Sequence, residues 1–150
     1  MANNLVLVTH AGFAEGILSS LRLIMGNPCE TAVVSVTATE TIDAIAGMIE
    51  ETIDSLDREN PTVVLTDIPG GSTTQAALLV RESRPDVVFA AGLNLGMLLE
   101  VSLLPLVKGD PVGNASLVRE AAATSKEGIG LLDDLVPRGE DPLDADSDEL

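Results

Sequence analysis

Four short aliphatic runs, rich in β-branched residues, alternate along this chain with longer segments in which apolar residues recur every three or four positions. The runs are residues 5–8, 32–36, 63–65 and 87–91. Short apolar runs are typical of buried strands, and the segments between them have the spacing of amphipathic helices. This alternation predicts an α/β fold with a doubly wound, mainly parallel sheet and helices on both faces. Right-handed crossovers favour the strand order 2-1-3-4.

The segments between and after these runs carry separate helix signals. Apolar residues at helical spacing predict helices over residues 13–24, 42–56, 93–104 and about 112–126, and a third helix, after Ser72, that carries Ala76, Leu79 and Val80. Ser72 stands where it could cap the third of these helices. The short apolar run 129–132 is expected to form a final strand.

Residues 133–150 differ in composition from the rest of the chain. They carry eight acidic side chains and a single basic one, Arg138. A segment of this kind buries too little apolar surface to offset the entropy of ordering it. We therefore expect one domain over residues 1–132, followed by an acidic and disordered C-terminal tail.

Charge and composition exclude several classes of partner. The formal net charge of −16 repels phosphate backbones and anionic membranes and favours a partner with a basic face. With two Phe and no Trp or Tyr, the chain also lacks aromatic platforms for stacking bases, so no nucleic-acid partner is expected. The single cysteine, Cys29, cannot form an internal disulfide, and no leader or membrane-spanning run is evident. The expected location is the cytoplasm.

The only histidine of the chain, His10, follows the first aliphatic run and precedes the first helical segment. The third run leads into residues 66–72, which read Thr-Asp-Ile-Pro-Gly-Gly-Ser. In a sheet of order 2-1-3-4, the carboxyl ends of strands one and three lie side by side at the switch point where ligands bind. We therefore expect His10 and Asp67 to meet at this edge of the sheet.

These residue types suit phosphoryl chemistry. A carboxylate at Asp67 that accepts the Nδ1 proton of His10 would leave the Nε2 lone pair free to act as a nucleophile. Gly70 and Gly71 allow close approach of the backbone, and the amides that lead into a helix at Ser72 would form a cradle for an anion. No cluster of metal ligands lies nearby in the sequence, so no metal or other cofactor is expected. A phosphoryl group carried on His10 is the favoured interpretation.

Each of these signals also has a purely structural interpretation. A single histidine is often only solvated or hydrogen-bonded, and an aspartate before a turn often binds the amides of that turn. Gly-Gly-Ser is commonly a tight turn with a helix cap. A receiver domain, which carries its phosphoryl group on an aspartate after the third strand, is disfavoured. Thr9 and His10 stand where that domain needs an acidic pair to hold Mg²⁺.

Three sequence blocks in the same order resemble the mannose-family IIA component of the bacterial phosphoenolpyruvate:sugar phosphotransferase system. They are residues 9–16 (Thr-His-Ala-Gly-Phe-Ala-Glu-Gly), 66–72, and 91–100 (Ala-Gly-Leu-Asn-Leu-Gly-Met-Leu-Leu-Glu). The resemblance extends over about residues 5–132. It implies that His10 accepts a phosphoryl group at Nε2 from the carrier protein HPr and passes it to a separate IIB component. That component serves a IIC/IID membrane permease.

The same resemblance implies supporting roles for other residues. Asp67 would orient His10, and Thr66 and Ser72 would lie beside the phosphoryl group. The protein would be a homodimer in which the final strand, here residues 129–132, crosses to the partner's sheet in antiparallel sense. The transported sugar cannot be read from this chain, because the membrane components of such a system bind it.

The chain departs from the family pattern at three positions. The family often has an aromatic residue where Pro69 stands, and often has Pro where Thr73 and Gly96 stand. These differences leave His10 and Asp67 in place and affect the expected partner contacts. Two alternatives stay open. One is the phosphotransferase subunit of dihydroxyacetone kinase, which shares the fold and the strand-one histidine, and the other is a non-catalytic, anion-binding regulatory module.

Overall fold

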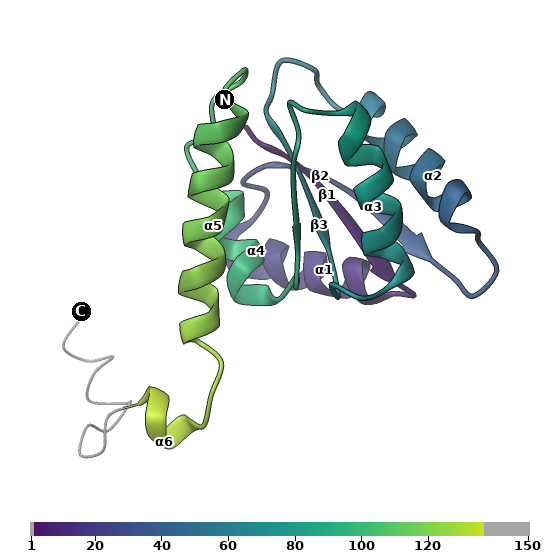
Figure 1. Ribbon diagram of the computed structural model, residues 1–150. Helices are drawn as coiled ribbons and strands as arrows, with labels where there is room; N and C mark the ends of the chain where they lie inside the picture. Colours follow the sequence, from purple (N-terminus) through teal and green to yellow (C-terminus); the bar gives the residue numbers. More distant parts are fainter. Residues whose placement is uncertain (1, 137–150) are drawn as a thin grey trace.

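The computed structural model describes residues 2–136, in which four strands alternate with helices (Figure 1). The first four predicted strands and the five predicted helices are present, and most of their ends fall within two residues of the expected positions. The elements are β1 (Asn4–His10), α1 (Phe13–Met25), β2 (Glu30–Val36), α2 (Ile42–Ser55), β3 (Thr62–Thr66), α3 (Ser72–Ser83), β4 (Val88–Ala91), α4 (Leu95–Ser102), α5 (Pro111–Glu127) and α6 (Leu132–Leu135).

The four strands form one sheet in the order β2-β1-β3-β4, and all neighbouring pairs are parallel. This confirms the predicted strand order. Strand β1 is central and pairs Leu7 with Val33 of β2 on one side and with Leu65 of β3 on the other. Because helices cover both faces of the sheet, β1 is apolar along nearly its whole length and is buried from its first residue to Thr9.

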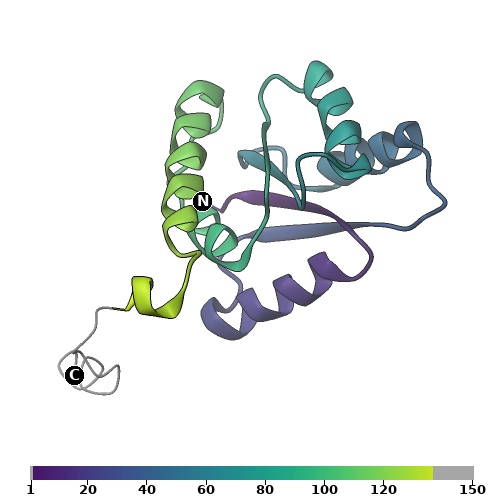
Figure 2. The same cartoon turned by 60° about the horizontal axis from the view of Figure 1, so that its bottom comes forward.

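Alternate side chains of β1 supply two separate cores. Leu5 and Leu7 face a core that they share with α1, α4 and α5, and Val6 and Val8 face a core shared with α2 and α3. The two helical layers lie on opposite faces of the sheet (Figures 1 and 2). All four side chains are fully buried, and each contributes about 1.5–3 kcal/mol of transfer free energy. Packing on both faces holds β1 and β3 in place, and therefore also the edge of the sheet at which these two strands end.

Side chains cap several of the helices, but Ser72 does not cap α3. Thr41 accepts a hydrogen bond from the Ala44 amide at the start of α2, and Asn94 accepts one from the Met97 amide at the start of α4. The N-cap residue of α3 is Gly71, and no side chain caps this helix. The predicted Ser72 cap is therefore wrong: Ser72 is already the first helical residue, which leaves its amide at the open end of the helix.

The structure shows no strand at residues 129–132, which corrects the predicted final strand. These residues lead from α5 into the short helix α6, and Ile129, Leu131 and Leu132 are each at least two-thirds exposed. A strand needs a neighbouring backbone. Here the carbonyls of Leu131 and Leu132 instead accept hydrogen bonds from residues 134–136.

The predicted start of the acidic tail, at residue 133, falls inside α6, and the remaining tail residues 137–150 lie outside the described residues. Within residues 2–136, none of the helices is both long and apolar enough to span a membrane.

Candidate functional site

His10 is the last residue of β1 and lies at the carboxyl edge of the sheet with 45% of its side chain exposed. The backbone turns sharply after it. Ala11 adopts a left-handed conformation with a φ of 49°, and its amide donates to the Val36 carbonyl at 2.8 Å. The buried Thr9 hydroxyl accepts a hydrogen bond of 2.9 Å from the Ala14 amide in the first turn of α1. These contacts hold the imidazole between the end of β1 and the start of α1.

The expected contact between His10 and Asp67 is present. Asp67 follows the last residue of β3, and its Oδ2 lies 2.7 Å from His10 Nδ1 and accepts a 2.8 Å hydrogen bond from the His10 amide. A carboxylate can only accept hydrogen bonds, so Nδ1 carries the proton that points at Asp67. In the neutral imidazole this places the free lone pair on Nε2.

The Asp67 carboxylate is saturated with hydrogen bonds. Its second oxygen, Oδ1, accepts from the Ile68 amide at 3.0 Å and from the Thr73 hydroxyl at 2.8 Å. Partial burial alone would raise the pKa of Asp67, but the hydrogen bonds from His10, Thr73 and Ile68 outweigh it and hold the pKa below its ordinary value. Asp67 is therefore an anion at neutral pH and a permanent acceptor for the His10 ring.

The Gly-Gly turn packs directly against the imidazole. A Cβ at Gly71 would lie 3.0 Å from His10 Cε1 and 3.1 Å from Ile68 Cγ1, whereas a Cβ at Gly70 would meet nothing within 4 Å. A side chain at position 71 would therefore crowd His10 and Ile68, whereas the φ of −91° is itself open to any residue. The predicted close approach of backbone occurs at Gly71 and not at Gly70.

Unpaired backbone amides surround this edge of the sheet. Within the described part of the chain, the amides of Gly70 and Ser72 donate to no protein acceptor. The amino-terminal ends of α1 and α3 lie at the same edge (Figure 1). Free N–H groups and two positive helix-dipole ends favour an anion here. The arrangement can bind a phosphoryl group and offers it a nucleophilic nitrogen.

Thr66, predicted to lie beside a phosphoryl group, is at the site but turned inward. It is the last residue of β3 and is only 2% exposed. Its hydroxyl lies 2.7 Å from the Thr74 hydroxyl, which in turn donates to the Ile68 carbonyl at 2.6 Å. This chain of hydrogen bonds ties the end of β3 to the first turn of α3 and to the Ile68 carbonyl in the turn.

Sequence reasoning missed Thr73 as a member of the site. It drew attention there only as a departure from a family pattern, yet its hydroxyl binds Asp67 and its side chain is completely buried. The signal that could have found it is a hydroxyl residue six positions after Asp67, in the first turn of α3. Thr9 and Ala11, which shape the turn after His10, were named only as part of the block 9–16, and no structural role was predicted for them.

Other reactive groups do not join this site. Cys29 is buried at the start of β2, and burial raises the pKa of its thiol. Among residues 2–136 there is no group of three His, Cys, Asp or Glu side chains placed to hold a metal ion.

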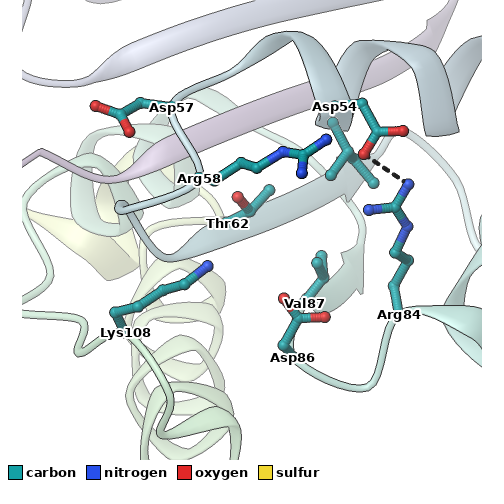
Figure 3. A pocket seen from close by; sticks show the side chains of 9 residues that line it. Asp54, Asp57, Arg58, Thr62, Arg84, Asp86, Val87 and Lys108 are labelled. Carbon is teal, nitrogen blue, oxygen red and sulfur yellow. Dashed lines mark ion pairs between the residues drawn. The ribbon is translucent and has the colours of Figure 1, made fainter.

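A second hollow, of about 280 Å³, lies at the opposite edge of the sheet, near the start of β3 and the loop before β4 (Figure 3). Arg84 dominates it and binds Asp54 at 2.8 Å and Glu50 at 3.1 Å, which ties the loop after α3 to α2. The acidic and basic side chains around it are equal in number; they are Asp54, Asp57, Asp86, Arg58, Arg84 and Lys108. This hollow has no imidazole and no excess charge.

Comparisons with known proteins agree with this geometry. The family model described as PTS system fructose IIA component, where PTS is the phosphotransferase system, matches residues 4–108. A mannose/sorbose-specific IIA subunit from Enterococcus faecalis is 26% identical, with a TM-score of 0.76 over 93% of this chain and 100% of that one. A PTS component EIIA from Streptococcus agalactiae is also 26% identical, with a TM-score of 0.71 over 85% and 95% of the two chains.

A IIA protein associated with the fucose utilization operon of Streptococcus pneumoniae shares the fold at 22% identity, with a TM-score of 0.71 over 91% of this chain and 100% of that one. The matched family region holds both His10 and the Asp67 turn, together with the whole sheet. The resemblance to mannose-family IIA components is thereby confirmed. The chain belongs to the PTS fructose IIA component family and is a IIA component of the sugar phosphotransferase system.

Proposed function

We propose that this protein is a phosphohistidine carrier that accepts a phosphoryl group from phospho-HPr on His10 Nε2 and passes it to a IIB component. The observation that carries the proposal is the 2.7 Å contact between His10 Nδ1 and Asp67 Oδ2. It holds the proton on Nδ1 and leaves the lone pair on Nε2 of a half-exposed side chain.

The transfer needs only positioning and charge stabilisation from this chain. The Nε2 lone pair forms a new P–N bond while the P–N bond to the donor histidine breaks, and its electron pair returns to the donor imidazole. The free amides of Gly70 and Ser72 would stabilise the phosphoryl oxygens, and Asp67 would balance positive charge that develops on the His10 ring. The second transfer, to IIB, reverses these roles.

The expected partners follow from charge and from family membership. A net charge of −16 favours encounter with a basic face on HPr and accelerates association more than it strengthens binding. Through IIB, the phosphoryl group would reach sugar that enters by a IIC/IID permease. In the proposed relay, this protein contributes only its own side chains and backbone amides.

The test is to incubate the protein with phosphoenolpyruvate, the first enzyme of the system and HPr, and to measure its intact mass. We expect wild type to gain one phosphoryl group that is lost in acid and stable in base, and His10→Ala to gain none. Subsequent loss of the group to a IIB component, and not to a kinase subunit with bound nucleotide, distinguishes the sugar branch. An unmodified wild type contradicts the proposal.

We also propose that the protein works as a homodimer. Strand β4 is an edge strand, and beside it lies a hollow of about 500 Å³ whose lining includes Val88, Phe89 and Val112. After α5, the exposed side chains of Ile129, Leu131 and Leu132 supply apolar surface that a second copy could cover at this edge.

Light scattering tests the dimer. We expect wild type to be dimeric and Leu131→Asp to shift toward monomer, because an aspartate cannot be buried at the interface without cost. Leu23→Asp on α1, where Leu23 is 89% exposed, is the matched control and should stay dimeric. A monomeric wild type contradicts this proposal and leaves the relay intact.

A further inference from the structure

The two oxygens of the Asp67 carboxylate are held by different parts of the fold. Both donors to Oδ2 come from His10 at the end of β1. One donor to Oδ1 is the Ile68 amide, which belongs to the same peptide group as the Asp67 carbonyl and moves with it. The other is the hydroxyl of Thr73, in the first turn of α3. Thr73 is thus the one donor to Oδ1, among the described residues, that comes from outside the turn itself.

From this arrangement we propose that Thr73 is a positioning residue for the His10 relay: its hydroxyl fixes the plane of the Asp67 carboxylate and thereby the direction of His10 Nε2. The inference rests on the proposed function and adds a residue to it. Thr73 touches neither the imidazole nor the reacting nitrogen, so it acts through Asp67.

The physical basis is the torsion between Cβ and Cγ of Asp67, which is soft for a carboxylate. A carboxylate anchored at one oxygen can swing about the bond to its partner, whereas anchors on both oxygens fix its plane. The Thr73 anchor is rigid because the side chain is completely buried and its backbone belongs to α3. Since Nδ1 and Nε2 lie on opposite sides of the ring, a tilt at the Asp67 contact displaces Nε2 from an in-line approach to phosphorus.

Charge supports the same role. The Thr73 hydrogen bond is one of those that lower the pKa of Asp67 against the effect of partial burial. His10 is the only titratable side chain hydrogen-bonded to this carboxylate within residues 2–136. Loss of the Thr73 hydroxyl therefore removes one interaction that lowers the pKa of Asp67. It also removes one anchor that orients the carboxylate toward His10.

The experiment compares three variants in the phosphoryl-transfer assay. Thr73→Val keeps the shape and removes the hydroxyl, and we expect the rate of phosphorylation by phospho-HPr to fall about five- to tenfold. Thr73→Ser keeps the hydroxyl and should restore most of the rate. Thr74→Val removes a neighbouring hydroxyl that does not contact Asp67 and should have the smaller effect. Equal rates for wild type and Thr73→Val overturn the inference and leave the relay standing.

A second measurement needs no phosphoryl donor and so separates this inference from the proposed function. Carbon NMR of the Asp67 carboxyl should show its pKa rising toward the ordinary value in Thr73→Val, with wild-type behaviour in Thr73→Ser and Thr74→Val. The Nδ1 proton of His10 should exchange faster with solvent in Thr73→Val alone. Unchanged titration and exchange in Thr73→Val contradict the positioning role even if wild type proves unable to accept phosphoryl.

Discussion

At each of the two edges of the sheet, a carboxylate contacts a nitrogen-bearing side chain from another element, yet the two edges are built in opposite ways. At the carboxyl edge, His10 and Asp67 lie 2.7 Å apart among backbone amides that have no protein acceptor. At the amino edge, Arg84 lies between two carboxylates, and the surrounding acidic and basic side chains balance one another (Figure 3). The carboxyl edge therefore keeps free hydrogen-bond donors, whereas the charged side chains of the amino edge pair with one another.

This difference shows which edge of the sheet is suited to phosphoryl transfer. The amino edge pairs side chains that are themselves partly exposed, so solvent screens them and the pair contributes little beyond joining α2 to the loop after α3. At the carboxyl edge the groups available to a phosphoryl group are backbone N–H groups. They are fixed dipoles, so they need no reorganisation when the phosphoryl group binds. A charged lining is a poor guide here, because the hollow at the amino edge has no imidazole.

Of the substitutions that test this comparison, Asp67→Asn should reduce the rate of phosphoryl transfer most strongly. The amide would present a donor where His10 needs an acceptor, which favours the wrong imidazole tautomer. We expect phosphoryl transfer to slow by about 100-fold while the fold is preserved. Asp86→Asn, at the amino edge, is the matched control and should leave the transfer rate unchanged. An unchanged rate in Asp67→Asn would remove that residue from the mechanism.

Gly71→Ala should have the next largest effect. The added Cβ lies too close to His10 Cε1 and to Ile68, so the ring must move. We expect about a tenfold slower transfer, from displacement of Nε2 by a few tenths of an ångström. NMR of the His10 Cε1–H group reports this displacement directly. Gly70→Ala has open space around its Cβ and should move that signal much less; equal shifts in the two variants would contradict the crowding argument.

Acid should act on the carboxyl edge through Asp67. Because the folded state holds the pKa of Asp67 below its ordinary value of about 3.9, the carboxylate stabilises the fold above that pH. This contribution is lost as pH falls through the lowered pKa. Urea unfolding from pH 7 down to acid should therefore show wild type more stable than Asp67→Asn at neutral pH, with the gap closing in acid. A gap that widens toward acid would reverse the sign of this linkage.

The smallest effect is expected at the amino edge, from Arg84→Met. The side chain is 23% exposed and its partners are more so, which limits the loss of unfolding free energy to about 0.5–1 kcal/mol. The phosphoryl-transfer rate should not change, because the charges at this edge serve only one another. A large drop in that rate would show that the two edges are coupled through the sheet.

The sequence by itself determined the strands, their order and the meeting of His10 with Asp67. These follow from hydrophobic periodicity and from the handedness of parallel crossovers, both of which depend on local pattern and chain geometry. Leu5 to Val8 could belong only to a strand covered on both faces, and such a strand places the residue after it at a ligand-binding edge.

The tertiary structure alone decided how the site is held. Thr73 reaches Asp67 only because α3 begins one residue earlier than a Ser72 cap would require, and a shift of one residue turns a helical side chain by about 100°. The run 129–132 reads as a strand by composition, but a strand exists only where another backbone pairs with it, and within residues 2–136 none does. Periodicity specifies which elements form. Hydrogen bonds between side chains distant in sequence depend on the packing of all elements together.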